Sequence, residues 1–494
     1  MSCSLIRLHP SVHHEHLRAE ITIDHLGFRP ERIWNPSPSV RHRTAPYPLP
    51  HTAVIGMAGN AETGAKFSPP PFAVALEGRG RKALVAVAAR AGWHRWNEAV
   101  FQADSRRVQV LLDLEGHARP DEAQPHVTVA VLPGEPGESN LALLSRGLAR
   151  LYPAASRPRS SPEPAWWRRP IYCGWGDQVS ISQWLEGAGP EPRALAYCTQ
   201  GLYERWIRRL EHTRVPIGTV TIDAGWSPAG VWEPDSERWP DLRGFIRRQH
   251  EAGRRVLLWL AAWLWDGLPD DWCLFAGKTK LTADPTHPAY RAALRARVRE
   301  LLAPDGYDAD GFKIDQLAFC PSERRPRGGA RFGLAGERPG SHPRLSEPAG
   351  RTWGCELLYR LQKDIAEAAR AAKPDALLTS STVHPYFHDT FDMVRLHDMG
   401  LVAPDIFAAM GARASLARAA LPGKPIDTDD WIHSDYAMWR HYTAGSSAIG
   451  VPCIFYAERF MADWRREPAT RLIPAADLRR IGDAWRRAGL GREA

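Results

Sequence analysis

From residue 171 onward, short apolar runs alternate with amphipathic stretches of helical periodicity. This alternation is typical of parallel strand–helix units that pack helices against one sheet. The apolar runs predict eight strands near residues 171–174, 218–223, 255–260, 311–315, 377–380, 393–396, 425–427 and 453–456. Eight such units over about 320 residues fit an α/β fold of the TIM type, a closed (β/α)8 barrel.

A doubly wound open sheet is the competing arrangement. Such a sheet normally carries a glycine-rich phosphate loop after one of its strands, where a nucleotide binds. No loop of this kind follows any of the predicted strands. The sequence therefore favours the closed barrel.

The first 135 residues are rich in predicted strands. Strand-like runs lie at 20–24, 83–89, 108–114 and 127–132 and are separated by Gly, Pro and Asp, which predicts a β-sandwich. A helix is predicted over 138–151, and the Pro-, Ser- and Arg-rich residues 153–162 are typical of a linker. We therefore expect a β-sandwich domain over 1–135, a helix and linker over 136–164, and a barrel domain over 165–494.

Charge and cysteine content exclude several classes of function. The net charge of +8 comes mostly from Arg scattered along amphipathic stretches, whereas a nucleic-acid surface needs a concentrated patch with aromatics. The seven Cys show no CxxC spacing, which predicts free thiols and a reducing compartment. The N-terminus lacks a signal-peptide core, and the longest apolar run, 256–265, is too short to span a bilayer. We expect a soluble cytoplasmic protein without nucleic-acid or membrane partners; self-association into a homo-oligomer stays open.

The run His13-His14-Glu15-His16 is the clearest candidate for a metal site. Consecutive His residues on a strand point to opposite faces, and no second cluster of ligands accompanies them. We therefore expect no metal and no cofactor.

Polar and aromatic residues follow almost every predicted barrel strand. The carboxyl ends of barrel strands carry functional groups, and carboxylates with aromatic faces at one rim are typical of a sugar pocket. The residues at these ends are Trp175, Asp177, Asp223, Trp226, Trp259, Trp263, Lys313, Asp315, Ser380, His384, Arg395, Asp398, Asp427, Asp429, Asp430, Tyr456 and Glu458.

The fourth predicted strand ends in Lys313-Ile314-Asp315. Side chains at i and i+2 of a strand point to the same face, so Lys313 and Asp315 should project together. An ammonium group beside a carboxylate favours its ionised form, which a nucleophile at a sugar carbon needs. On the motif alone, a purely structural Lys–Asp pair is an equal alternative.

Several short motifs, in order along residues 165–460, resemble those of the retaining α-glycosidases of glycoside hydrolase clan D, the α-galactosidase superfamily with its α-glucosidase relatives. They are Ile222-Asp223-Ala224-Gly225-Trp226, Trp239-Pro240-Asp241-Leu242, Gly253-Arg254-Arg255-Val256-Leu257-Leu258-Trp259, Asp284-Pro285-Thr286-His287-Pro288, Lys313-Ile314-Asp315 and Arg395-Leu396-His397-Asp398. The second-strand pair of Asp in the family is Asp223-Ala224 here, which marks a divergent branch and leaves galactose specificity open.

The resemblance implies roles for individual residues. Asp315 corresponds to the nucleophile and Asp398 to the acid/base, which needs a raised pKa to arrive protonated; Asp392 is the second candidate for the acid/base. The substrate-binding residues implied are Trp175, Asp223, Trp226, Trp259, Lys313, Arg395 and Asp429. For Asp429, the cap of a helix before Trp431 is an equally ordinary interpretation.

Three functions stay open at this stage. The first is hydrolysis of terminal α-linked sugars in an oligosaccharide or glycoside. The second is transglycosylation of the raffinose-synthase-like type, in which a sugar acceptor replaces water. The third is a non-catalytic carbohydrate-binding barrel. The Arg-, Gly- and Pro-rich residues 321–351 are predicted to form either a lid or a disordered segment.

Overall fold

Eight parallel strands form one sheet, in the order β20-β19-β18-β17-β14-β13-β12-β21. The ring closes where Asp427 bridges Val451, just ahead of β21, and the Thr428 N–H donates to the Val451 carbonyl at 3.0 Å. The predicted eight strands and the closed barrel are thus confirmed. The strands are β12 (Ile171–Cys173), β13 (Thr219–Ile222), β14 (Arg255–Ala261), β17 (Gly311–Asp315), β18 (Leu377–Ser380), β19 (Met393–Arg395), β20 (Ile426–Asp427) and β21 (Cys453–Ile454).

This computed structural model describes residues 3–10, 16–36, 46–56, 67–114, 126–157, 162–187, 191–228, 230–261, 263–317, 346–398, 405–462 and 470–490. Most of the segment 321–351, predicted to be a lid or disordered, lies outside the described residues. None of the helices in these ranges is long and apolar enough to cross a bilayer.

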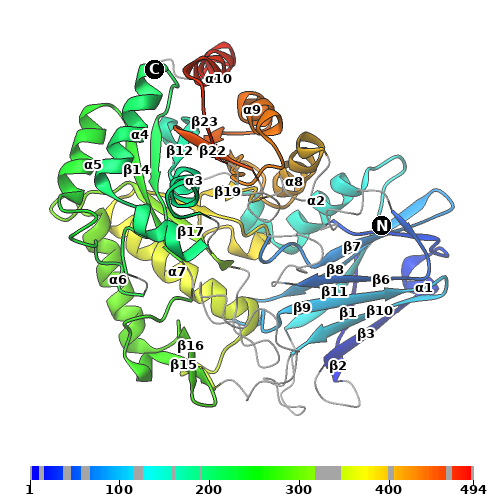
Figure 1. The fold of residues 1–494 in the computed structure, drawn as a ribbon. Coiled ribbons are helices and arrows are strands. Elements are labelled where there is room, and N and C mark those ends of the chain that lie inside the picture. The colour runs from blue at the N-terminus through cyan, green and yellow to red at the C-terminus, as the bar shows by residue number, and fades with distance from the viewer. Residues whose placement is uncertain are drawn as a thin grey trace.

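Helices surround the barrel (Figure 1). They are α3 (Trp175–Glu186), α4 (Gln200–His212), α5 (Leu242–Glu251), α6 (Pro288–Leu302), α7 (Gly354–Ala372), α8 (Ile406–Ala420), α9 (Tyr436–Gly445) and α10 (Ala475–Arg487). Two hairpins, β15 (Cys273–Ala276) with β16 (Thr279–Ala283) and β22 (Arg459–Met461) with β23 (Thr470–Leu472), interrupt the repeat. Side-chain caps start several helices: the Asp435 carboxylate accepts from the Met438 N–H at the start of α9. The cap interpretation of Asp429 was therefore wrong.

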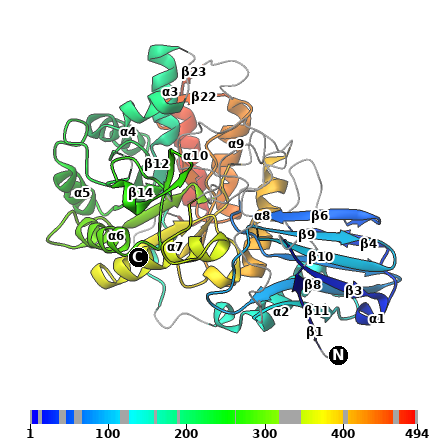
Figure 2. The same ribbon diagram turned by 90° about the horizontal axis from the view of Figure 1, so that it is seen from below.

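The fifth strand–helix unit lacks its helix. Residues 381–392, between β18 and β19, contain only the 3-10 turn Pro385–Phe387. The N-terminal part docks there instead: Ser68 N–H donates to the Ser381 carbonyl at 3.3 Å and Val383 N–H to the Pro69 carbonyl at 3.1 Å. Figure 2 shows α8 next to the sandwich strands. The sandwich thus covers the side of the barrel that a helix would otherwise cover.

Two antiparallel sheets form the predicted β-sandwich, which is confirmed. One has the order β1-β11-β8-β7-β4-β5 and the other β2-β3-β10-β9-β6. Their strands are β1 (Ser4–Arg7), β2 (His9–Pro10), β3 (His16–Thr22), β4 (Arg32–Trp34), β5 (Tyr47–Pro48), β6 (His51–Gly56), β7 (Ala73–Gly78), β8 (Arg81–Ala89), β9 (Glu98–Ala103), β10 (Arg107–Asp113) and β11 (Val127–Pro133). The strand predicted at 20–24 ends at Thr22, because Thr22 caps the short helix α1 (Ile23–Leu26).

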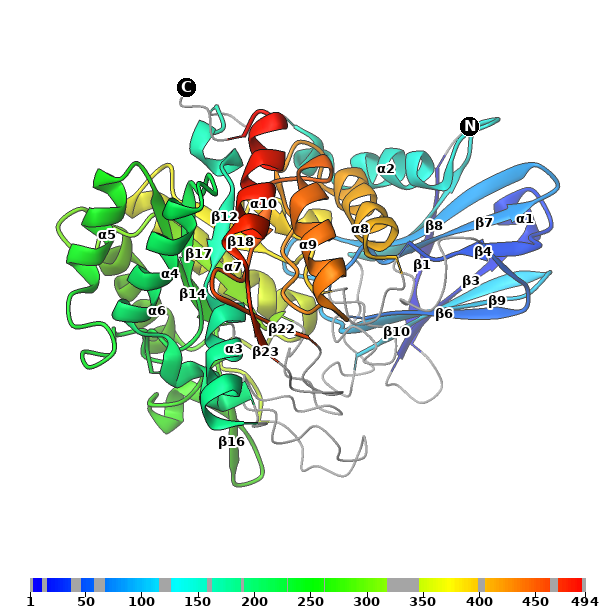
Figure 3. The ribbon, with the colours of Figure 1, turned by 45° about the horizontal axis from the view of Figure 1, so that its top comes forward.

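The helix predicted over 138–151 is α2 (Asn140–Leu151), which begins after the cap Ser139. Helix α2 packs both on β8 of the sandwich and on α8 of the barrel (Figure 3). Its buried face contains Leu143, Leu144 and Leu148, which belong to one continuous hydrophobic core with the barrel. The sandwich is therefore held rigidly against the barrel by apolar packing as well as by the strand-end hydrogen bonds.

At the opposite end of the barrel from the polar strand ends, Asp310 fastens β14 to β17. Its buried carboxylate accepts from the Val256 N–H at 2.8 Å and contacts His250 Nε2 at 2.7 Å and Lys373 Nζ at 3.2 Å. Burial alone would raise the pKa of Asp310, but His250 and Lys373 outweigh it, so the pKa lies below its usual range. Gly311 follows because its φ of +146° and the Leu377 carbonyl, 1.9 Å from where a Cβ would stand, leave no space for a side chain.

We predict that Asp310→Ala lowers the free energy of unfolding by about 3–5 kcal/mol, because it strands buried donors and cations. The stabilisation that the ionised Asp310 carboxylate provides should be complete above the pKa of Asp in the unfolded chain, about 4. It should disappear as the pH falls through the lower pKa that Asp310 has in the folded protein. Urea unfolding at several pH values measures both. The exposed Asp305→Ala is the matched control; equal stability of the two variants would contradict the prediction.

Candidate active site

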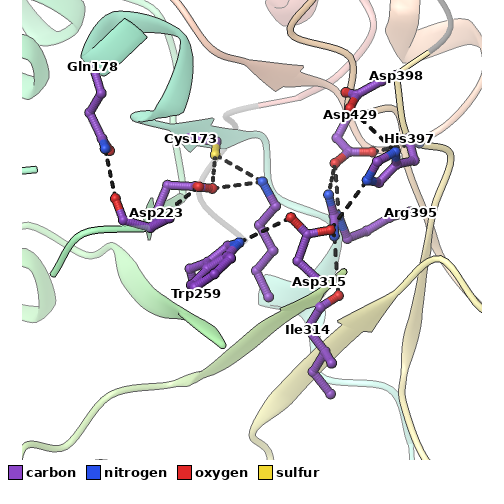
Figure 4. Close-up of polar contacts among 12 residues, drawn as sticks. Cys173, Gln178, Asp223, Trp259, Ile314, Asp315, Arg395, His397, Asp398 and Asp429 are labelled. Carbon is purple, nitrogen blue, oxygen red and sulfur yellow. Dashed lines mark hydrogen bonds and ion pairs between the residues drawn. The ribbon is translucent and has the colours of Figure 1, made fainter. Parts of the chain in front are cut away.

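The carboxyl ends of the barrel strands bring several of the predicted polar residues together in two neighbouring groups of hydrogen bonds and ion pairs (Figure 4). One group contains Asp223 and Lys313, and the other contains Asp315, Arg395, Asp398 and Asp429. β13 supplies Asp223, β17 supplies Lys313 and Asp315, and β19 supplies Arg395 and the turn after it. Alternation along β17 places Lys313 and Asp315 on the same face, as predicted. The sequence did not predict which of these charged residues pair with each other.

Asp315 is held by donors from three directions. Its Oδ2 accepts from the Trp259 indole N–H at 3.1 Å, and its Oδ1 contacts Arg395 Nη1 at 3.2 Å and His397 Nε2 at 3.3 Å. Burial alone would raise the pKa of Asp315, but Arg395 and His397 outweigh it, and the pKa lies well below its usual range. The side chain is still 21% exposed. Asp315 is thus an ionised carboxylate that is open to the barrel mouth.

Lys313 has a different partner from the predicted one. Its Nζ pairs with Asp223 Oδ2 at 2.7 Å and lies 3.4 Å from the Cys173 sulfur, which also donates to Asp223 at 3.0 Å. Its influence on the ionisation of Asp315 is weaker than that of Arg395. Lys313 thus favours the ionised form of Asp315, in the predicted direction, but Arg395 contributes most because its guanidinium reaches Asp315 directly.

Arg395 connects the end of β17 to the segment after β20. Its Nε and Nη2 donate to Asp429 Oδ2 at 2.8 and 2.7 Å, while its Nη1 also donates to the Ile314 carbonyl at 3.2 Å. Both side chains of this pair are only 2% exposed. Burial would lower the pKa of Arg395, but Asp429 and Asp315 raise it well above its usual value. The guanidinium is a permanent charge that fixes both carboxylates.

Asp398 lies in the turn after β19, next to His397. The His397 Nδ1 atom is 3.4 Å from Asp398 Oδ2, and the Nε2 of the same ring contacts Asp315. One imidazole ring therefore contacts both carboxylates. The rival Asp392 lies before β19, at the other end of the barrel, where its Oδ2 accepts from the Leu378 N–H at 3.1 Å. The geometry favours Asp398 over Asp392 as the partner of Asp315.

The three predicted aromatic walls occupy different depths. Trp259 is 8% exposed and its indole donates to Asp315. Trp226 is fully buried behind it, and its indole N–H donates to the Trp259 carbonyl at 2.8 Å. Trp175, the first residue of α3, is half-buried and meets Trp431 edge to face, with ring centroids 5.9 Å apart. Trp175 and Trp259 border the mouth, whereas Trp226 supports Trp259.

Beneath the network, the barrel holds a cavity of about 10 Å³, lined by residues that include Lys313, Thr379, Asp427 and Cys453. Burial and the neighbouring Asp429 raise the pKa of Asp427 well above its usual value, and its Oδ1 atom accepts no hydrogen bond from the described residues. Burial and Asp429 thus disfavour the ionised form of Asp427. Nowhere in the described ranges do three His, Cys, Asp or Glu side chains gather as metal ligands; His13-His14-Glu15 lies outside them.

Three members of the site were missed as functional residues. Cys173 is the last residue of the buried strand β12, where a Cys looks like any other apolar core residue, so the sequence did not predict a role for it. His397 stands inside the quoted motif of β19, between Arg395 and Asp398, and that position is the signal that could have identified it. Asp427 was predicted at a strand end, but the rise of its pKa depends on burial and on the tertiary neighbour Asp429.

No protein-family model matches the sequence, and no curated protein matches it. Solved structures share the fold. The cycloalternan-degrading enzyme from Trueperella pyogenes superposes with a TM-score of 0.58 over 96% of this chain and 67% of that chain, at 14% sequence identity. An α-galactosidase from Thermus thermophilus, in complex with stachyose, gives 0.54 over 95% and 92%, at 15% identity. A xylosidase from Aspergillus niger gives 0.59 over 98% and 66%, at 14% identity.

The buried pair of Lys313 and Asp223 generates a stability prediction. Lys313→Met should lower the free energy of unfolding by about 3–5 kcal/mol, because it leaves Asp223 buried without its cation. The double variant Lys313→Met/Asp223→Leu should recover most of that loss, since it removes both charges. Urea denaturation of the two variants and the wild type measures the difference. A loss in the single variant below about 1 kcal/mol, the value of an exposed pair, would contradict the prediction.

Proposed function

We propose that this protein is a retaining α-glycosidase that resembles clan D, the α-galactosidase superfamily, and hydrolyses terminal α-linked sugars of oligosaccharides or glycosides. Asp315 would be the nucleophile and Asp398 the acid/base. The observation that carries the proposal is Asp315 itself: an ionised carboxylate at the end of the fourth barrel strand, open to the mouth and one imidazole ring away from a second carboxyl group.

The chemistry proceeds in two displacements. In the first, an oxygen of Asp315 attacks the anomeric carbon, the glycosidic bond breaks, and Asp398 gives its proton to the departing oxygen. This step leaves a covalent sugar ester on Asp315. In the second, Asp398 takes a proton from water, the water oxygen attacks the anomeric carbon, and the ester bond breaks. The two inversions together retain the configuration of the sugar.

The remaining residues of the site fit substrate binding and positioning. Asp223, held in place by Lys313, offers oxygens that accept from sugar hydroxyls, and the rim indoles of Trp175 and Trp259 suit the apolar face of a pyranose ring. Arg395 donates to both Asp429 and Asp315, and Asp429 also accepts from the His397 N–H. Their role is to hold the nucleophile, and Trp226 holds Trp259 in the same way.

The solved neighbours support the chemistry as well as the substrate class. The Trueperella enzyme has also been solved in complex with a covalent intermediate, at a TM-score of 0.57 to this chain. The Thermus enzyme was solved with stachyose, an oligosaccharide. In the proposed mechanism, the covalent intermediate of this chain would form on Asp315.

Activity against a panel of aryl α-glycosides tests the proposal. We expect wild-type turnover of at least one sugar and a loss of about 10²–10⁴-fold in kcat/KM for Asp398→Ala, the value of a general acid. Asp315→Ala should lose at least as much, because it removes the covalent route. Asp305→Ala is the control at an exposed position, and Asp392→Asn tests the rival carboxyl. A wild type that cleaves no glycoside in the panel would favour a carbohydrate-binding barrel.

The configuration of the first product separates retention from inversion. Proton NMR recorded during cleavage of an α-glycoside should show the α-anomer of the sugar before mutarotation. Added oligosaccharide acceptors compete with water for the sugar ester on Asp315. More transfer product than free sugar would indicate transglycosylation from the same intermediate. Initial release of the β-anomer would contradict the double displacement.

A further inference from the structure

We propose that His397 is a positioning residue that links the two reacting carboxyl groups through a single neutral imidazole. Its Nε2 donates to Asp315, and its buried Nδ1, which makes no hydrogen bond with the described residues and lies 3.4 Å from Asp398 Oδ2, offers a lone pair to the proton of Asp398. This inference rests on the proposed function and assigns a role to a residue that the motif comparison passed over. It explains how one carboxyl group is kept ionised and the other protonated in the same small space.

The ring of His397 is fixed from its backbone. The His397 N–H donates to Asp429 Oδ1 at 2.8 Å, and the preceding Leu396 N–H donates to the Asp427 carbonyl at 3.0 Å. Its φ of +60° is the left-handed conformation, which His adopts more readily than most side chains. The side chain is 15% exposed. Asp429 therefore binds both the His397 backbone and the Arg395 guanidinium, and so it positions the imidazole ring and the guanidinium together.

The hydrogen-bonding polarity follows from the partners. An ionised carboxylate can only accept, so the contact of 3.3 Å with Asp315 requires a proton on Nε2. A neutral imidazole carries one proton, so Nδ1 then has only a lone pair. This atom is buried, makes no hydrogen bond with the described residues and lies 3.4 Å from Asp398 Oδ2, which makes Asp398 the nearest group that could donate to it. A lone pair repels an ionised carboxylate and accepts from a protonated one. The ring thus favours ionised Asp315 and protonated Asp398, the pair of states that begins the first displacement.

A doubly protonated ring is the competing arrangement. Asp315 Oδ1, which the ring contacts, is also contacted by Arg395 Nη1 at 3.2 Å. Asp315 is therefore already paired with Arg395, a cation that stays protonated. A second positive charge beside Arg395 would be repelled by it, and an imidazolium would favour the ionised form of Asp398, which cannot act as the acid.

Removal of the ring tests this role. His397→Gly suits the left-handed backbone and removes both contacts. We expect kcat/KM to fall about 10²-fold, the effect of misplacing a reacting group by about 1 Å. The acidic limb of its pH profile should move to higher pH, because Asp315 loses a donor that lowers its pKa. Free imidazole should restore activity, whereas 1-methylimidazole, which has no N–H, should not. His212→Asn, at an exposed position, is the control.

A second measurement does not depend on turnover. Nitrogen-15 NMR of the imidazoles, with His397 assigned from the His397→Asn spectrum, should show a neutral ring protonated at Nε2 in the wild type and loss of that preference in Asp315→Ala. An imidazolium or an Nδ1–H form would overturn the inference. So would an unchanged pH profile in an active His397→Gly, which would leave the glycosidase proposal intact. Absence of wild-type turnover would overturn the glycosidase instead, and the tautomer would still decide whether His397 links the two groups.

Discussion

Buried positive charge at the mouth of the barrel determines how the site is built. Lys313 and Arg395 lie among the carboxylates at the strand ends, and each is fixed by one of them, Asp223 or Asp429. Charges this deeply buried are tolerated only when they are paired, so the strand ends can adopt few other arrangements. Asp315 is the third carboxylate beside these two pairs. It is ionised, open to the mouth and in contact with Arg395. The ionised state of the proposed nucleophile thus follows from the charge balance at the barrel mouth.

The buried ion pairs also affect the titratable groups beside them. Burial and the neighbouring Asp429 raise the pKa of Asp427. His397 contacts both members of the proposed reacting pair. The architecture around the site gives this network a rigid frame. The sandwich takes the place of the missing helix between β18 and β19, and it is anchored there by Ser68 and Thr382, whose hydroxyl donates to the Ser68 carbonyl at 3.0 Å.

The sequence was sufficient for the barrel because each strand is a short apolar run bounded by turn residues. Sandwich strands such as β4 and β5 were missed, since strands of two or three residues leave no periodic pattern. At the site, the same-face placement of Lys313 and Asp315 followed from strand geometry alone. The partners of Lys313 did not, because Asp223 comes from the second strand and only barrel closure brings it within reach. The role of His397 depends on one left-handed residue, which no periodicity encodes.

The central claim is that Asp315 receives the sugar. Incubation with an activated fluorosugar, which forms the glycosyl ester readily and releases it slowly, followed by peptide mass spectrometry, tests it most directly. The account predicts a single added sugar on the peptide that contains Asp315, and none in Asp315→Ala. A sugar attached to any other residue, or an enzyme that cleaves glycosides without ever being labelled, would contradict it.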